Sequence, residues 1–576
     1  MEQDKRDTSR NKVLVVGLDG GTYSVLGPFM DDGKLPTLAA MMKRGCWGEL
    51  ASTIPPHTAP AWASFITGKN SGKHGIFQFG LIDRSVYKGR IRRILNSSSI
   101  PGETLWDTIG RAKKTVGIMN VPLTYPPRPV NGFMVTGMLT PRDSEHFTYP
   151  SSLKSALGDY KIDVSVGEGK YSVLDDLNTE DEGILLEFIG QLRALVEIRT
   201  ETAIRLMRTY SPDFFMILFT ETDRLQHIFW PYLDRMRGQS EDPMAQKIQA
   251  AVEDFYQHLD GNLAKLFGVA GQGTAKILMS DHGFGPATKK DVNFNVWLRD
   301  NGLLRLGKSP KNAFNPRAWL RRVGLSKETL YPLMSFLFPG NVVRRLERAW
   351  AKVVSMPIDW SQTKAVFIPV FEFVGGIEIV RNEHADQLGG AQLRDYEDFR
   401  TNIIQRLLAL RDPHTAESIV LAAYRREELY TGAHTHDAPD IIFVMATDYR
   451  GEKGLTSKQL ISKRSKNVSL WTGTHRREGV VILSGPNISP GRMTYTPQIQ
   501  DLAPTILYLM GLAIPEDMDG KVIEEAIEGS YLADHEIKYA EPISYSERDS
   551  KAKEMSFSEE EMEKVRKQLE SLGYLS

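Results

Sequence analysis

Six short apolar runs, each ending in polar or turn-forming residues, constrain the fold of this sequence more than any other feature. They occupy residues 13–21, 115–123, 213–223, 276–284, 440–448 and 479–487. Stretches with helical spacing of their apolar residues lie between them, for example 182–209. Buried strands that alternate with helices are typical of a parallel sheet covered by helices on both faces. We therefore expect an α/β fold with a mostly parallel sheet.

Polar residues with metal-binding side chains cluster at the ends of these runs. Asp19 lies at the end of the first run, Asp223 and His227 follow the third, and the pair Asp281-His282 closes the fourth. In parallel sheets, functional groups collect beyond the carboxyl ends of the strands. If 223–227 is helical, its two side chains lie on one face and can bind the same ion.

A further histidine, His475, lies in a polar loop just before the sixth run. Each of these residues alone also fits an ordinary structural role, such as a helix cap for Asp19 or a surface position for His475. Together, carboxylates and imidazoles at strand ends indicate a metal site. This ligand set suits Zn²⁺, with Mn²⁺ and Fe²⁺ as competitors.

The stretch TIPPHTAPAWASFITGKNSGKHGIF, residues 53–77, superficially resembles a phosphate-binding loop. A P-loop needs four residues between its first glycine and its Gly-Lys pair, followed by Ser or Thr. Here Gly68 is one residue too close to Gly72-Lys73, and His74 takes the hydroxyl position. GLDGGTYS, at 17–24, is likewise a poor dinucleotide motif because its aspartate would repel a pyrophosphate.

Composition narrows the class of protein. The chain has 576 residues, 41% of them hydrophobic, and a formal net charge of -1, so no nucleic-acid partner is expected. The single cysteine, Cys46, excludes an intramolecular disulfide and a CxxC metal site. No signal peptide is visible, and the apolar stretch 330–339 is too short to span a membrane. We expect a cytoplasmic protein.

A segment rich in arginine interrupts the α/β pattern. We expect a core at 10–295 and 360–530, a helical cap at 300–357, and a tail at 531–576 that ends in an amphipathic helix with a Ser-x-x-Glu capping box. Within the cap, 317–352 holds eight basic and two acidic residues. A solvated helical face explains this charge, and contact with a membrane surface or an anionic substrate is the alternative. The residues His434, His436 and Asp437 resemble an extra metal cluster, but we predict a loop there.

Taken in order, these motifs resemble the alkaline phosphatase superfamily, and within it the type I phosphodiesterase/nucleotide pyrophosphatase branch. The matching pieces are GLDGG, PPHTAPAWASFITGKNSGKHGI, TETDRLQH, SDHGF, GTHRREG with LSGP, and IQDLAPTILYLMGLAIPEDMDGKVI. The resemblance implies an alkaline-phosphatase-like core and two divalent metal ions. It assigns one ion to Asp223, His227 and His475, and the other to Asp19, Asp281, His282 and the nucleophile Thr58.

The implied activity is hydrolysis of a small phosphate ester, a phosphodiester or nucleotide pyrophosphate, through a phospho-threonine intermediate. The sequence departs from the branch at HGIFQFG, where Phe79 stands near the place of a phosphate-binding Asn, with Gln78 as a possible substitute. A sulfatase is not expected, because 58–62 lacks Cys/Ser-x-Pro-x-Arg. Two alternatives stay open, a phosphomutase or phosphomonoesterase on the same core and a non-catalytic metal-binding homologue.

Overall fold

The computed structural model describes residues 11–83, 90–163, 181–234, 240–307, 358–380, 391–455, 457, 459–464, 471–542 and 557–571. The chain divides into two compact units. The first comprises Met1–Pro286, Gly432–His434 and Thr472–Ser576, and the second comprises Ala287–Thr431 and Thr435–Trp471. Much of 360–530, which we grouped with the core, therefore lies in the second unit. The basic segment 317–352 lies outside the described residues.

A nine-stranded sheet forms the centre of the first unit, in the order β20-β2-β19-β9-β1-β8-β5-β6-β7. Its strands are β1 (Lys12–Leu18), β2 (Cys46–Ala51), β5 (Val116–Met119), β6 (Gly132–Val135), β7 (Thr148–Tyr149), β8 (Phe214–Phe219), β9 (Thr274–Met279), β19 (Glu478–Ser484) and β20 (Gly491–Arg492). The neighbours β9, β1, β8, β5 and β6 are all parallel. The mostly parallel sheet predicted from the apolar runs is confirmed.

Two of the six apolar runs differ from the simplest expectation. The run at 479–487 forms β19, which pairs antiparallel with β9. The run at 440–448 forms β15 (Ile441–Met445), which belongs to a sheet of the second unit. A buried apolar strand looks the same in either orientation and in either sheet, so its composition alone does not reveal its neighbours.

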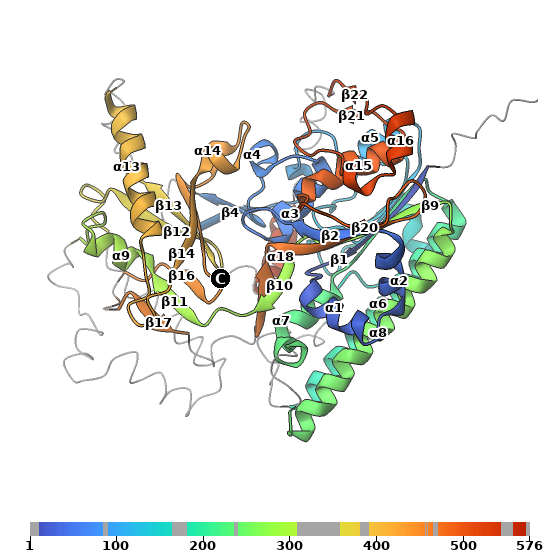
Figure 1. Cartoon of the computed structure of the whole chain (residues 1–576), viewed down its shortest axis with the longest axis horizontal. Helices are drawn as coiled ribbons and strands as arrows, with labels where there is room; N and C mark the ends of the chain where they lie inside the picture. Colours follow the sequence, from blue (N-terminus) through green and yellow to red (C-terminus); the bar gives the residue numbers. More distant parts are fainter. Residues whose placement is uncertain are drawn as a thin grey trace, which may run out of the picture. The chain divides into compact units, whose positions relative to one another are not determined.

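Helices cover both faces of the large sheet (Figure 1). On one face lie α3 (Thr58–Thr67), α5 (Leu105–Arg111) and α15 (Leu502–Leu509), and on the other lie α1 (Tyr23–Asp31), α2 (Pro36–Arg44), α6 (Glu182–Tyr210) and α8 (Pro243–Ala270). The long helices α6 and α8 pack side by side. The helix predicted at 182–209 is present as α6.

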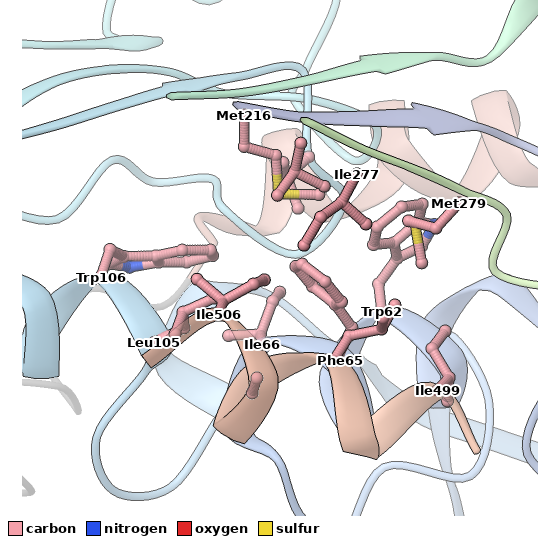
Figure 2. Close-up of a cluster of buried hydrophobic side chains, with 14 of the residues drawn as sticks. Trp62, Phe65, Ile66, Leu105, Trp106, Met216, Ile277, Met279, Ile499 and Ile506 are labelled. Carbon is pink, nitrogen blue, oxygen red and sulfur yellow. The ribbon is translucent and has the colours of Figure 1, made fainter. Parts of the chain in front are cut away.

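The core between α3 and the sheet fixes the position of this helix. Trp62, Phe65 and Ile66 point from α3 toward Met216 of β8 and Ile277 of β9 (Figure 2). Alternate residues of a strand face the same side, so each strand contributes every second side chain to this layer. Because every residue of α3 is buried, its first turn is held rigidly against the sheet.

The predicted C-terminal helix is α18 (Glu559–Ser571), and it packs on the first unit. Its capping box is formed by Ser558 and Glu561, each of which accepts a hydrogen bond from the other's backbone N–H, at 2.9 and 3.2 Å. Val565 and Leu569 join the hydrophobic core. Helix α18 therefore packs as part of the hydrophobic core of this unit.

The second unit is built on two smaller sheets. One is antiparallel, in the order β12 (Ala365–Phe371), β13 (Val374–Ile379), β15 and β14 (Val420–Arg425), and the other has the order β16 (Tyr449–Glu452), β11 (Lys290–Asn293) and β17 (Ile461–Lys463). Its helices include α9 (Phe294–Asp300), α13 (Ala391–Leu408) and α14 (Arg426–Leu429). Among the described residues of the whole chain, none of the helices has the length and apolar character to span a membrane.

Candidate active site

Three neighbouring parallel strands bring the predicted carboxylates to one edge of the sheet. β1 lies between β9 and β8, so the carboxyl ends of all three point the same way. Asp19 follows β1 directly, and Asp281 lies two residues beyond β9. β8 leads into α7 (Glu221–Leu233), on which Asp223 and His227 stand one turn apart. Residues more than 200 positions apart in the sequence thus meet at this edge.

His475 reaches the same place through a short strand. It lies in β18 (Gly473–Arg476), which pairs antiparallel with β10 (Gly283–Pro286) and sets His475 opposite Phe284. Our expectation of a loop before the next strand was wrong. A four-residue strand that contains polar side chains carries no apolar run by which to recognise it.

The first cluster consists of Asp223, His227 and His475. Asp223 Oδ1 lies 3.3 Å from Nε2 of His227 and 3.3 Å from Nε2 of His475. The two Nε2 atoms are 3.2 Å apart. All three side chains are buried, so three metal-binding atoms converge on one point in the protein interior.

The second cluster consists of Asp19, Asp281 and His282, with Thr58 beside them. His282 Nε2 lies 3.3 Å from Asp281 Oδ2, 3.5 Å from Asp19 Oδ1 and 3.4 Å from Thr58 Oγ1. The His282 ring stacks on that of His475 at a centroid distance of 3.5 Å. The two clusters are therefore adjacent, and His282 is close enough to Asp223 and His475 to complete a ligand group with them as well.

The hydrogen bonds of the three imidazoles establish their tautomers. Nδ1 of His227, His282 and His475 lies 3.0–3.1 Å from the carbonyl oxygen of Gly473, Gly283 and Pro56, respectively. A carbonyl can only accept, so each Nδ1 carries the proton. Each Nε2 then presents its lone pair to the clusters, which is the usual arrangement of a metal-binding histidine.

Burial perturbs the acids of both clusters. It raises the pKa of Asp19 well above the usual value, with the charges of Asp281 and Asp223 adding to the effect. Burial also raises the pKa of Asp281 to about 7. Burial alone would raise the pKa of Asp223, but the neighbouring histidines hold it well below the usual value. Three buried carboxylates so close together repel each other, and a divalent cation would relieve that repulsion.

Two threonines of the stretch 53–77, Thr53 and Thr58, stand two residues before a proline, and the structure places them differently. Thr58 is the first residue of α3 and faces His282, whereas Thr53 donates its hydroxyl hydrogen to Pro55 O at 2.7 Å. The Gly-Lys pair is also accounted for, since Lys73 forms an ion pair with Asp519 at 2.7 Å.

The sequence matches one protein family over most of its length. The family model described as type I phosphodiesterase / nucleotide pyrophosphatase matches residues 13–467. This range covers most of the chain, including all the predicted site residues except His475. The chain belongs to this family. Membership supports a phosphoester hydrolase, which the sequence motifs also indicate.

Solved structures with similar folds include two enzymes. Phosphonoacetate hydrolase from Sinorhizobium meliloti, in complex with phosphonoformate, is 16% identical with a TM-score of 0.49 over 87% of this chain and 95% of the other. Murine ectonucleotide pyrophosphatase / phosphodiesterase 5, in an inactive form with AMP, is 14% identical with a TM-score of 0.44 over the same shares. None of the curated proteins compared with the chain matches it.

This member of the phosphodiesterase family differs from the expected pattern near Thr58. Phe79, near the expected Asn position, is buried, and its ring meets that of His57 edge to face at 4.8 Å. His57 caps α3 by accepting the N–H of Ala59 at Nδ1, so its tautomer is opposite to that of the three cluster histidines. Burial lowers the pKa of His57 to about 3, which keeps the ring neutral.

One residue of the TETDRLQH motif that the sequence did not single out contacts the first cluster. Arg224 donates to Asp223 Oδ2 at 2.8 Å and to Asp163 Oδ2 at 3.1 Å. This bond orients the Asp223 carboxylate with its other oxygen toward the histidines. In the sequence, the positive charge of Arg224 beside Asp223 argues against a cation there, and only the fold shows that Arg224 binds the oxygen turned away from the histidines.

The group His434, His436 and Asp437 does not assemble a metal site. The ring of His434 lies over Gly75, and the backbone N–H of His434 donates to Gly72 O at 2.8 Å. The side chain of His436 is 74% exposed. The predicted loop takes the form of a single 3-10 turn at Thr435–Asp437. Among the described residues, the two groups that could hold a metal ion are Asp223 with His282 and His475, and Asp19 with Asp281 and His282.

Proposed function

We propose that this protein hydrolyses small phosphodiesters or nucleotide pyrophosphates through a phosphorylated Thr58, with two divalent metal ions bound by the two clusters. The observation that carries the proposal is the common tautomer of His227, His282 and His475. The lone pairs of His227 and His475 face the Asp223 carboxylate, and that of His282 faces Asp19, Asp281 and the Thr58 hydroxyl.

The spacing of the ligand atoms fits a metal ion. Four ligands in a tetrahedron with bonds of about 2.0 Å are about 3.3 Å apart. The ligand atoms of Asp223, His227 and His475 are separated by 3.2–3.3 Å, which corresponds to three corners of such a tetrahedron. This geometry and the mixed imidazole and carboxylate ligands support Zn²⁺, with Mn²⁺ as the alternative.

In the second cluster, Asp19 Oδ1 and Asp281 Oδ2 are buried and accept no hydrogen bond from the residues that the structure describes. Leaving buried carboxylate oxygens without a donor is costly unless a cation satisfies them. Asp19, Asp281, His282 and the Thr58 hydroxyl would hold the second ion.

The chemistry needs an activated hydroxyl and a stabilised leaving group. Bound divalent ions would lower the pKa of the Thr58 hydroxyl and neutralise charge on the phosphoryl oxygens. Thr58 Oγ1 would attack phosphorus, the alcohol or nucleotide would leave, and water would then hydrolyse the phosphothreonine. The rigid packing of α3 holds Thr58 in place for attack, and His282 accepts its hydrogen bond.

The test compares Thr58→Ala with Thr53→Ala, since both remove a hydroxyl from a Thr-x-Pro sequence. With Zn²⁺ or Mn²⁺ present, Thr58→Ala should lose at least about 10³-fold in turnover of bis-p-nitrophenyl phosphate. Thr53→Ala should stay near wild type. An active Thr58→Ala variant would refute the nucleophile.

A substrate panel tests the remaining alternatives. Preference for p-nitrophenyl phosphate over the diester would favour the monoesterase or mutase, which the buried Phe79 at the Asn position keeps open. Absence of turnover with either ester, in protein shown to contain two ions, would favour a non-catalytic metal-binding role.

A further inference from the structure

The loop 19–21, which carries Asp19 and follows β1, is held by side chains along its whole backbone. Three consecutive carbonyls each accept a hydrogen bond from a different side chain. Asp19 O accepts from Thr222 Oγ1 at 2.6 Å, Gly20 O from Gln226 Nε2 at 2.9 Å, and Gly21 O from Ser280 Oγ at 2.9 Å. All three donor residues are buried.

The N–H groups of this loop are bonded as well. The N–H of Gly20 donates to Asp281 Oδ1 at 3.2 Å, and that of Asp19 donates to Phe219 O at 3.0 Å. The bond to Asp281 leaves its other oxygen, Oδ2, directed toward His282. The loop therefore orients the carboxylate of Asp281 while it presents that of Asp19.

Two of the three side-chain donors come from α7, the helix that also carries ligands of the first cluster. Thr222 and Gln226 are four residues apart, as are Asp223 and His227, and each pair lies on one face of the helix. One face of α7 thus binds the loop of the second cluster, and the adjacent face supplies ligands to the first. Gln226 Nε2 also lies 3.1 Å from Thr222 O, so its amide nitrogen faces two carbonyls.

We propose that Thr222 and Gln226 are positioning residues that set the Asp19 carboxylate against Asp281 and His282, so that α7 holds both metal sites in register. This inference rests on the proposed two-metal function. It predicts that both residues control the affinity of the second cluster although neither is a ligand. Loss of a partner that orients a metal ligand typically weakens metal affinity 10- to 100-fold.

The experiment is a calorimetric titration of Zn²⁺ into chelator-stripped protein, with the bound ions counted by elemental analysis. His227→Ala and Asp281→Asn first assign the two binding steps to the two clusters. Thr222→Val and Gln226→Met should then weaken only the step assigned to Asp19, Asp281 and His282, by about 10- to 100-fold. Thr222→Ser, which keeps the hydroxyl, should restore most of the affinity.

Thr220→Val is the matched control. Thr220 is a buried threonine two positions earlier, and its hydroxyl accepts from Arg199 at 3.0 Å instead of donating to the loop. The Thr220→Val variant should bind both ions as the wild-type protein does. Thermal melting checks that each variant is folded.

The outcomes separate this inference from the proposed function. Wild-type protein that binds no Zn²⁺ at either cluster overturns the proposed function and this inference with it. Two normal binding steps in Thr222→Val and Gln226→Met overturn the inference alone. Equal weakening of both steps, or the same loss in Thr220→Val, also overturns it, because the effect would then be general destabilisation.

Discussion

Replacing Gly20 by alanine should destabilise the first unit and distort the metal site. Gly20 has φ +68°, a left-handed conformation that costs an L-residue about 1–2 kcal/mol. A Cβ atom at this position would lie 2.7 Å from Phe284 Cδ2, well inside van der Waals contact. Overpacking of this kind costs about 1–3 kcal/mol. The expected loss in the free energy of unfolding is therefore about 2–5 kcal/mol.

Differential scanning calorimetry measures this loss. The first unit has roughly 400 residues, so its unfolding entropy is about 0.8 kcal/mol per kelvin and each kcal/mol shifts Tm by about 1 °C. Gly20→Ala should lower Tm by about 2–5 °C. Gly27→Ala is the matched control, because Gly27 lies inside α1 with nothing within 4 Å of its added Cβ. That substitution should leave Tm unchanged or raise it by about 1 °C.

The Gly20→Ala substitution should also affect His227 and His475, which we propose as metal ligands. The ring of Phe284 lies 4.7 Å from that of His227 and 5.4 Å from that of His475. A ring pushed aside by the new methyl group would turn these imidazoles, and Zn²⁺ affinity should fall at least about 10-fold. If Gly20→Ala melts and binds Zn²⁺ as Gly27→Ala does, the loop relaxes without strain and this reasoning is refuted.

Three further predictions concern metal, pH and the C-terminal helix. If the free metal ion is present at about 100 times its Kd, its removal with a chelator should lower Tm by about 3 °C for each site emptied. Added Zn²⁺ should reverse the shift. Burial lowers the pKa of His74 to about 3. The neutral ring contributes stability that is fully present above pH 6.5, and the free energy of unfolding then falls by about 1.4 kcal/mol per pH unit as the pH drops toward 3. His74→Gln should flatten this part of the pH dependence in chemical denaturation, and an unchanged slope would exclude His74 as its source. Val565→Asp should cost about 3–5 kcal/mol by burying a charge in the core, whereas Lys567→Ala, at a 73% exposed side chain, should change Tm by less than about 1 °C.

The meeting of the strand-end carboxylates follows from the sequence more directly than the strand order does, for a physical reason. Asp19, Asp223 and Asp281 follow apolar runs, and in a parallel sheet all such ends meet at one edge, so proximity follows from the pattern. The order of the strands does not follow from the pattern, because every buried strand has a similar composition. The run at 440–448 could therefore be assigned to the large sheet although it lies in another.

Other features of the site depend on contacts that no local pattern records. The tautomers of His227 and His475 depend on carbonyls of distant segments, whereas that of His282 depends on the neighbouring Gly283. The roles of Thr222 and Gln226 depend on how α7 meets the loop after β1. In the sequence, Thr222 and Gln226 are polar residues that directly precede the proposed ligands Asp223 and His227, and nothing marks them out.

The hydrogen bonds of the first cluster also connect it to the segment that carries Thr58. His227 donates to Gly473 O, two residues before His475, and His475 donates to Pro56 O, two residues before Thr58. The orientation of each imidazole is thus fixed by the segment that carries the next group. An ion bound by His227 and His475 would hold both rings, and through Pro56 it would also hold the backbone that leads into α3. The placement of Thr58 would therefore depend on the first cluster as well as on the second, although its hydroxyl lies beside His282 of the second.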